Sequence, residues 1–329
     1  MTDTRHRLWL FLSLILVFSL LCSCGSSARA QAADDDTKET AQAVEEEPSA
    51  LKSEPGQRPN TPVVLVPEAP GDAVIGSEPL VVDISHLSEG YIMALYSGSA
   101  AKACIQLTGP DELTYKYFLP PSEDYACLPL TAGSGTYELA AYENVTDSQY
   151  ASLYKENLDV TLEDELLPYL YPNLYVDFTP DSKAVAAAVD IVAPADTDLE
   201  AVELAYHYVL EHVTYDTSKA ETVSSGYLPD VDETLATGRG ICFDYAALTA
   251  AMLRSQGIPT RLEIGYVGDV YHAWISVYVD ELGWIDKLIE FTGDGWTRMD
   301  PTFASSENSS STILQYIGDG SNYTLQYLH

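Results

Sequence analysis

The sequence predicts an α+β protein in which a β-rich part comes first, a helical part follows, and a second sheet comes last. Three observations lead to this prediction: short β-favouring segments between residues 80 and 161, apolar side chains at helical spacing between residues 182 and 256, and apolar strand-like segments between residues 261 and 299. The chain has 329 residues, of which 46 % are hydrophobic, so a sizeable core can be buried in one or two domains.

The N-terminus has the composition of a targeting signal. Two arginines precede the apolar run Leu8–Leu21, which is short for a membrane-spanning helix, since such a helix needs about 20 apolar residues. The run ends in Leu-Cys-Ser-Cys, which resembles a bacterial lipobox with Cys24 as the lipidated residue. We therefore expect a signal peptide at residues 1–23 and a lipid anchor on Cys24, at the extracytoplasmic face of the cell membrane. The alternative is an ordinary signal peptide cleaved near residues 28–30.

Residues 24–79 differ sharply from the rest of the chain. They are rich in Ala, Ser, Pro, Glu and Asp and lack aromatic residues. Such a segment cannot bury enough apolar surface to offset the entropy lost on ordering. We expect a disordered acidic linker that holds the folded part away from the membrane.

Residues 80–165 contain short β-favouring segments separated by Gly, Pro, Ser and Asp, which is typical of a small antiparallel β-sandwich. No catalytic motif is visible here, so we expect a spacer or a substrate-binding module. Cys104 and Cys127 lie in this part, and an extracytoplasmic location favours a disulfide between them. The alternative is two buried thiols.

Three helices are expected after residue 168. The first covers residues 182–192, and the second follows the capping-box pattern Thr-Asp-Leu-Glu that begins at Thr197. The third covers residues 241–256 and ends at a Gly with a Pro just beyond. Strands are then expected at the following ranges: Arg261–Val267, Ala273–Val279 and Trp296–Met299.

Cys242 lies in the first turn of the third helix, behind Gly238 and Gly240. Free backbone N–H groups and the positive end of the helix dipole stabilise a thiolate there, so we expect a pKa below that of a free thiol. The same N–H groups can form part of an oxyanion hole, and Gly240 leaves room for a substrate backbone. The alternative is an inert, buried structural cysteine.

A thiol nucleophile needs a base, and the base needs an acceptor that orients it. His272 opens a predicted strand, and Asp300 lies at the end of another. Neighbouring antiparallel strands can bring both residues to the start of the helix that carries Cys242. Taken alone, His272 is more often a core histidine, and Asp300 more often a turn residue.

The three blocks Gly-x-Gly-x-Cys-x-Asp-Tyr-Ala, His-Ala-Trp and Asp-Pro-Thr, in this order, resemble the transglutaminase-like superfamily. The resemblance implies a papain-like domain at residues 166–329, with the catalytic helix packed on an antiparallel sheet. It also implies that Cys242 is the nucleophile, His272 the base and then the acid, and Asp300 the residue that orients the imidazole. Tyr215 belongs to a short motif of the same kind and is a weaker candidate for shaping the site.

No calcium-binding loop and no zinc-binding pair of histidines are recognisable, so we expect neither a metal nor another cofactor. The formal net charge of −34 argues against nucleic acid as a partner. The sequence favours a cell-surface hydrolase that acts on an amide or peptide bond of a protein or peptide. Two alternatives stay open: a protein-glutamine transamidase, in which Trp274 and Trp296 help to line an amine channel, and a non-catalytic binding module.

Overall fold

The computed structural model of the chain describes most of the region after residue 54. The described residues are 55–146, 149–224, 226–267, 270–286, 291–292, 295–296 and 323–329. The predicted signal peptide, the predicted anchor Cys24 and the predicted site residue Asp300 lie outside these ranges. Among the described residues, no helix combines the length and the apolar character needed to cross a bilayer.

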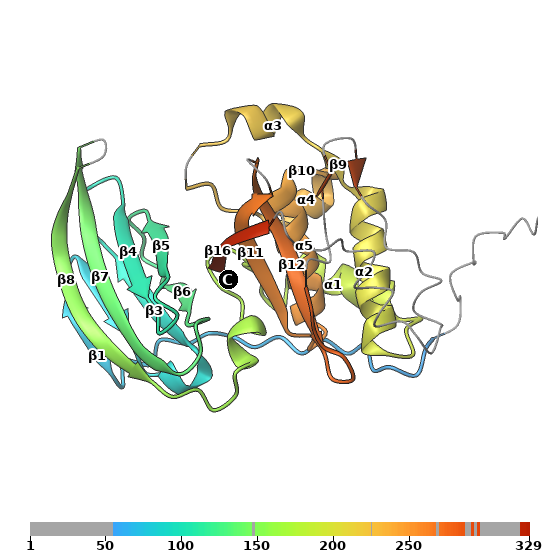
Figure 1. Cartoon of the computed structure of the whole chain (residues 1–329), viewed down its shortest axis with the longest axis horizontal. Coiled ribbons are helices and arrows are strands. Elements are labelled where there is room, and N and C mark those ends of the chain that lie inside the picture. The colour runs from blue at the N-terminus through green and yellow to red at the C-terminus, as the bar shows by residue number, and fades with distance from the viewer. Residues whose placement is uncertain are drawn as a thin grey trace, which may run out of the picture. The chain divides into compact units, whose positions relative to one another are not determined.

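The first part of the described chain is a β-sandwich, as predicted. One four-stranded antiparallel sheet has the order β1-β2-β3-β6, and the other has the order β5-β4-β7-β8 (Figure 1). Their bounds are β1 Val74–Ser77, β2 Leu80–Asp83, β3 Tyr91–Tyr96, β4 Ala103–Thr108, β5 Thr114–Leu119, β6 Ala126–Pro129, β7 Gly135–Thr146 and β8 Gln149–Val160. Alternate side chains of both sheets, such as Val82, Ile92, Ile105 and Leu139, fill one shared core.

The folded part begins earlier than the composition indicates. Strand β1 starts at Val74, and the segment before it is already packed against the helical part. The Arg58 guanidinium contacts the Asp198 carboxylate at 2.5 Å and donates to the carbonyl oxygen of Gln256 at 2.6 Å. Gly56 passes so close to Ala195 that a Cβ at Gly56 would lie 1.9 Å from the Ala195 carbonyl oxygen. Composition describes average hydrophobicity, and it overlooks single residues that fix a segment in this way.

The predicted disulfide is wrong, because Cys104 and Cys127 are both free thiols. In β4 the neighbours Ala103 and Ile105 face the sandwich core, so Cys104 points to the opposite face of its sheet. Cys127 belongs to the other sheet and packs with Tyr91 and other residues outside that core. The two thiol side chains therefore point away from each other, on the opposite outer faces of the sandwich. The alternative of two buried thiols is the one that the structure adopts.

Two 3₁₀ turns and five helices are described. The turns are η1 Leu87–Glu89 and η2 Leu167–Tyr169, and the helices are α1 Lys183–Val192, α2 Asp198–His212, α3 Thr217–Thr222, α4 Val231–Thr237 and α5 Cys242–Arg254. The N-cap of α2 is confirmed, since the Thr197 hydroxyl accepts from the N–H of Glu200 at 3.2 Å. The reciprocal bond differs from a capping box, because the Glu200 carboxylate accepts from the N–H of Asp196 at 2.6 Å and not from that of Thr197.

A further antiparallel sheet, separate from the two of the sandwich, packs against α5, which confirms the predicted fold class (Figure 1). Its order is β13-β12-β11-β16. The bounds are β11 Thr260–Val267, β12 Val270–Val279, β13 Gly283–Ile285 and β16 Tyr323–Leu328; the short pairs are β9 Thr214–Tyr215 with β10 Arg239–Gly240, and β14 Phe291–Thr292 with β15 Gly295–Trp296. Ala273, Ile275, Val277 and Val279 of β12 join the buried residues of the helices in one core.

Arg254, the last residue of α5, is completely buried. Its guanidinium donates to the carbonyl oxygens of Thr260, Tyr171 and His329, at 3.0, 2.7 and 2.8 Å. Burial lowers the pKa of Arg254 to about 9. The side chain therefore ties together the end of α5, the start of β11, the segment after the sandwich and the end of β16.

Candidate active site

Cys242 is the first residue of α5, as the sequence predicts. The chain reaches it through β10, which pairs in parallel with β9, so that Gly240 lies opposite Tyr215. Gly238 has a φ of +61°, and its added Cβ would lie 2.8 Å from the carbonyl oxygen of His212, so this position requires glycine. These constraints hold the backbone that enters the helix at Cys242.

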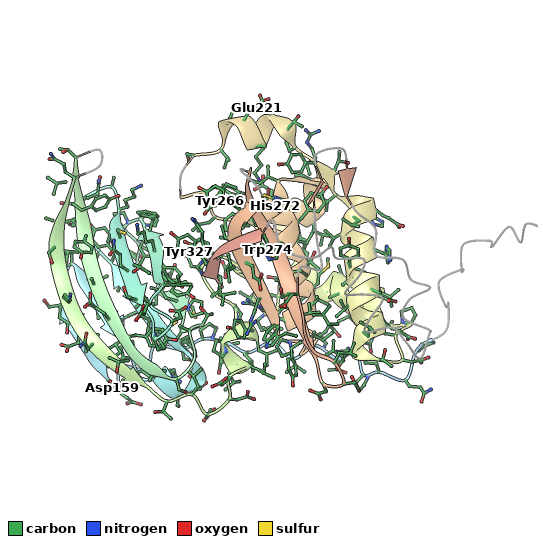
Figure 2. All side chains as sticks on the ribbon, viewed as in Figure 1. Asp159, Glu221, Tyr266, His272, Trp274 and Tyr327 are labelled. Carbon is green, nitrogen blue, oxygen red and sulfur yellow. The ribbon has the colours of Figure 1, made fainter. Side chains whose placement is uncertain are left out.

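The thiol of Cys242 lies against the backbone of β12. The N–H of Ala273 hydrogen-bonds to the sulfur and favours the thiolate, as does the N–H of Phe243. Ala273 directly follows His272 in β12, so the part of the strand that lies against the thiol is next in sequence to His272. On β12, Ala273 faces the core shared with the helices, whereas His272 stacks on Trp274 with ring centroids 6.4 Å apart (Figure 2).

The protonation states of Cys242 and His272 differ from those that the sequence predicts. Burial raises the pKa of the Cys242 thiol, and the nearby Asp244 carboxylate raises it further, against the lowering by backbone N–H groups. Burial lowers the pKa of His272 to about 4. The expected low thiol pKa is therefore wrong for this state: at neutral pH the Cys242 thiol and the His272 imidazole are both neutral, since desolvation outweighs the helix dipole.

The weaker site candidates take different places. Burial raises the pKa of the Tyr215 hydroxyl, and the charges of Cys242 and Asp244 raise it further. Gly240 is buried, and a Cβ there would lie 2.6 Å from the Cβ of Asp244, so its small size serves close packing. Trp274 has no exposed surface, and its indole N–H donates to the Glu263 carboxylate. Trp274 therefore packs against His272 inside the protein and presents no surface to a substrate.

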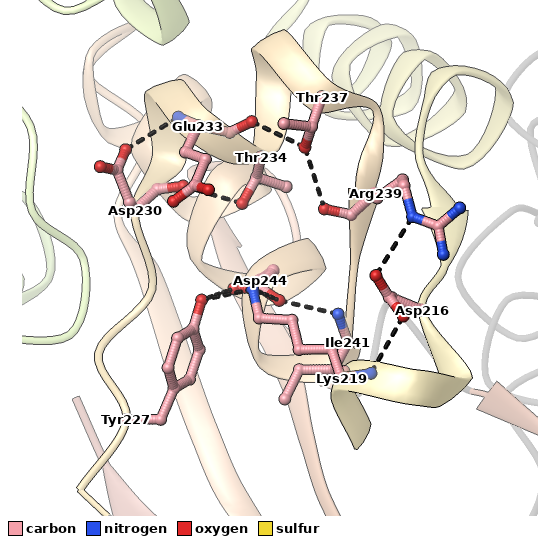
Figure 3. A network of polar contacts seen from close by, with 10 residues as sticks. All are labelled: Asp216, Lys219, Tyr227, Asp230, Glu233, Thr234, Thr237, Arg239, Ile241 and Asp244. Carbon is pink, nitrogen blue, oxygen red and sulfur yellow. Dashed lines mark hydrogen bonds and ion pairs between the residues drawn. The ribbon is translucent and has the colours of Figure 1, made fainter. Parts of the chain in front are cut away.

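Asp244, at the third position of α5, is the centre of a polar network that the sequence analysis did not identify (Figure 3). Its carboxylate accepts hydrogen bonds from the N–H of Ile241 at 2.8 Å and from the Tyr227 hydroxyl at 2.5 Å. It also forms an ion pair with the Lys219 ammonium at 2.8 Å. An Asp in the first turn of a helix predicts the hydrogen bond to the N–H of Ile241. The sequence does not predict its other partners, Lys219 on α3 and Tyr227 on the following loop.

A second ion pair holds α3 beside the same backbone. The Asp216 carboxylate accepts from the N–H of Lys219 at 3.0 Å and from the Arg239 side chain at 3.1 Å. The N–H of Asp216 donates to the carbonyl oxygen of Gly240 at 2.8 Å. As a result, α3 is attached on two sides to the segment that leads into Cys242 (Figure 3).

Comparison with known proteins agrees with the motifs. The sequence model of the transglutaminase-like superfamily matches residues 185–301. The uncharacterised protein ML0607 of Mycobacterium leprae (strain TN) is 30 % identical over 186 residues, which are 55 % of this chain and 61 % of that protein. The chain thus spans about three-fifths of that relative's length.

Solved structures show more distant likeness. A candidate cysteine protease from Cytophaga hutchinsonii is 13 % identical, with a TM-score of 0.35, over 70 % of this chain and 77 % of that one. Red sea bream transglutaminase is 16 % identical, with a TM-score of 0.25, over 64 % and 48 % of the two chains. The match of the sequence model includes Cys242, His272 and Asp300, and on this evidence residues 185–301 of the chain are a transglutaminase-like domain.

Proposed function

We propose that this chain is a thiol hydrolase that cleaves an amide or peptide bond through an acyl-enzyme on Cys242. The observation that carries the proposal is the contact between the Cys242 sulfur and the N–H of Ala273, which directly follows His272. Membership of the superfamily supports the same assignment, because the matched region contains both residues. Asp300 is proposed as the residue that orients the imidazole.

The reaction starts from the neutral pair. His272 takes the thiol proton as the sulfur attacks the carbonyl carbon, and the oxygen becomes negatively charged in a tetrahedral intermediate. The N–H groups at the start of α5 are available to stabilise that charge. When the C–N bond breaks, the imidazolium gives its proton to the leaving amine, and a thioester remains. Water then attacks the thioester with His272 as base, which releases a carboxylic acid and restores the thiol.

One observation favours hydrolysis over transfer to an amine. A transamidase must exclude water and guide an amine to the thioester through an apolar channel. Trp274 and Trp296 are the candidates for lining such a channel; the side chain of Trp274 is completely buried, and that of Trp296 lies outside the described side chains. Within the described residues, Tyr271 is an exposed aromatic residue near the sulfur, and its pKa is raised by burial and by nearby groups that include Cys242. Tyrosine hydroxyls leave such a surface accessible to water.

We also propose that the enzyme works at the cell surface. The lipobox-like sequence before Cys24 supports a lipid anchor, and the acidic segment after it supports a tether. The substrate would then be an extracytoplasmic protein or peptide.

Peptide and glycopeptide libraries test the proposal directly. The full-length protein should hydrolyse a subset of amides to an acid and an amine. Mass spectrometry detects the two products, whose summed mass exceeds that of the substrate by one water. Cys242→Ala should abolish this conversion. A parallel reaction contains a glutamine-rich protein and a labelled primary amine. Incorporation of the amine that depends on Cys242 would replace the hydrolase by a transamidase. Absence of both reactions would favour a binding module.

A further inference from the structure

The carboxylate of Asp244 is buried in a place where its charge opposes the proposed reaction. The side chain has no exposed surface, and it lies in the first turn of α5, two residues after the nucleophile. Its charge raises the pKa of both Cys242 and Tyr215. An isolated carboxylate there would work against the thiolate that attack on a substrate requires.

The same carboxylate has a structural task that an apolar residue cannot perform. It accepts the N–H of Ile241, the residue that leads into the helix, at 2.8 Å. This N–H lies at a buried helix start, where an unsatisfied donor costs free energy. Asp244 therefore sets the backbone beside the sulfur, and its charge has to be compensated from elsewhere.

The compensation comes from α3. The Lys219 ammonium lies 2.8 Å from the Asp244 carboxylate and 2.6 Å from the Tyr227 hydroxyl, which itself donates to Asp244 at 2.5 Å. The Lys219 side chain is 30 % exposed, so its charge is partly shielded from water. The bonds with Asp244 and Tyr227 raise the pKa of Lys219, and the ammonium stays charged at neutral pH.

We propose that Lys219 is a positioning residue for the nucleophile: it neutralises the Asp244 carboxylate, so that Asp244 can hold the backbone at Cys242 without opposing the thiolate. This inference rests on the proposed function of Cys242. Within the described residues, the titratable groups around the sulfur are Asp244 on the same helix, Tyr215 on β9, and Tyr271 and His272 on β12. Lys219 acts on the sulfur only through Asp244.

The attachment of α3 makes the proposal testable, because α3 does not depend on the Lys219 side chain. Asp216 caps the helix and pairs with Arg239 at 3.1 Å, and the backbone of Asp216 is bonded to Gly240. Removing the ammonium should therefore leave α3 in place. It should leave Asp244 uncompensated beside the thiol.

The experiment measures the rate at which iodoacetamide alkylates Cys242 in the full-length protein as a function of pH, with peptide mapping to separate Cys242 from the other thiols. Lys219→Met should shift the rate profile to higher pH and slow alkylation at pH 7 by about five- to tenfold, the size of a shift approaching one pH unit. Lys219→Arg, which keeps the charge, should stay within about twofold of wild type. Asp244→Asn should shift the profile to lower pH.

The double variant Lys219→Met/Asp244→Asn decides whether Lys219 acts through Asp244. If it does, the double variant should recover most of the rate lost in Lys219→Met, which is a large coupling between the two sites. An unchanged profile in Lys219→Met would overturn the proposal, and so would a double variant as slow as Lys219→Met. Because alkylation requires no substrate, this result is independent of whether the protein hydrolyses or transfers an acyl group.

Discussion

The N–H of Ala273 hydrogen-bonds to the sulfur of Cys242, so strand β12 meets the first residue of α5 at the point where His272 precedes Ala273. This contact joins a strand and a helix whose proposed catalytic residues, His272 and Cys242, are thirty positions apart in the chain. Burial shifts the pKa of each group toward its neutral form. The proposed reaction would therefore depend on proton transfer from the thiol to the imidazole more than on a preformed ion pair.

Removal of the imidazole should slow alkylation of the thiol. With a thiol pKa raised by burial and no imidazole to accept the proton, little thiolate is present at neutral pH. In His272→Ala, iodoacetamide should label Cys242 at least about tenfold more slowly at pH 7, while the difference should narrow at high pH. Peptide mapping of timed reactions measures this rate. Equal rates in the variant and the wild type would show that His272 does not act on this thiol.

Buried His272 should also make the fold sensitive to acid. Its pKa of about 4 lies below the ordinary value of 6.5, so the unfolded chain binds the proton more readily. Stability is then lost as the pH falls from about 6.5 to about 4, by at most about 3 kcal/mol from this residue. In His272→Gln, urea unfolding at pH 7 and pH 4.5 should differ less than in the wild type. His212→Gln, which changes an exposed histidine, should keep the full difference.

Arg254 should be essential for stability. Replacing it by Met removes the donors for three carbonyl oxygens that lie in otherwise buried backbone. Breaking a buried charged network of this kind costs about 3–5 kcal/mol. Denaturant unfolding of Arg254→Met measures the loss. Lys155→Met is a control, because Lys155 forms an exposed ion pair with Glu138, and it should change stability little. A loss below about 1 kcal/mol in Arg254→Met would contradict the assigned role.

The anchor prediction concerns the mature protein in its native host. Because the sequence up to Cys24 resembles a lipobox, Cys24→Ala should abolish lipidation and release the protein from the detergent phase on phase partitioning. Cys22→Ala serves as the matched control, because Cys22 lies two residues before the predicted anchor, and this variant should still partition with detergent. Detergent partitioning of Cys24→Ala equal to that of the wild type would rule out the anchor.

Much of the fold could be predicted because its signals are local. The apolar spacing and the Gly before Cys242 indicated the start of α5 to within a residue, and the strands at Arg261 and Ala273 were expected at nearly their observed places. The order of the predicted strands indicated that His272 and Asp300 can reach the start of the helix that carries Cys242, and the resemblance to a family implied their roles. Spacing along the chain shows that two strands can meet, but it does not show which atoms do.

The sequence by itself determined the order of sandwich, helices and final sheet, and it indicated Cys242 as the candidate nucleophile, because hydrophobic periodicity and helix-start chemistry are properties of neighbouring residues. The tertiary structure alone decided that Cys104 and Cys127 face apart and that Lys219 meets Asp244. It also decided that the Cys242 thiol and the His272 imidazole are neutral at neutral pH. These outcomes depend on burial and on contacts between distant segments, since desolvation and ion pairing are set by everything that surrounds a group in space.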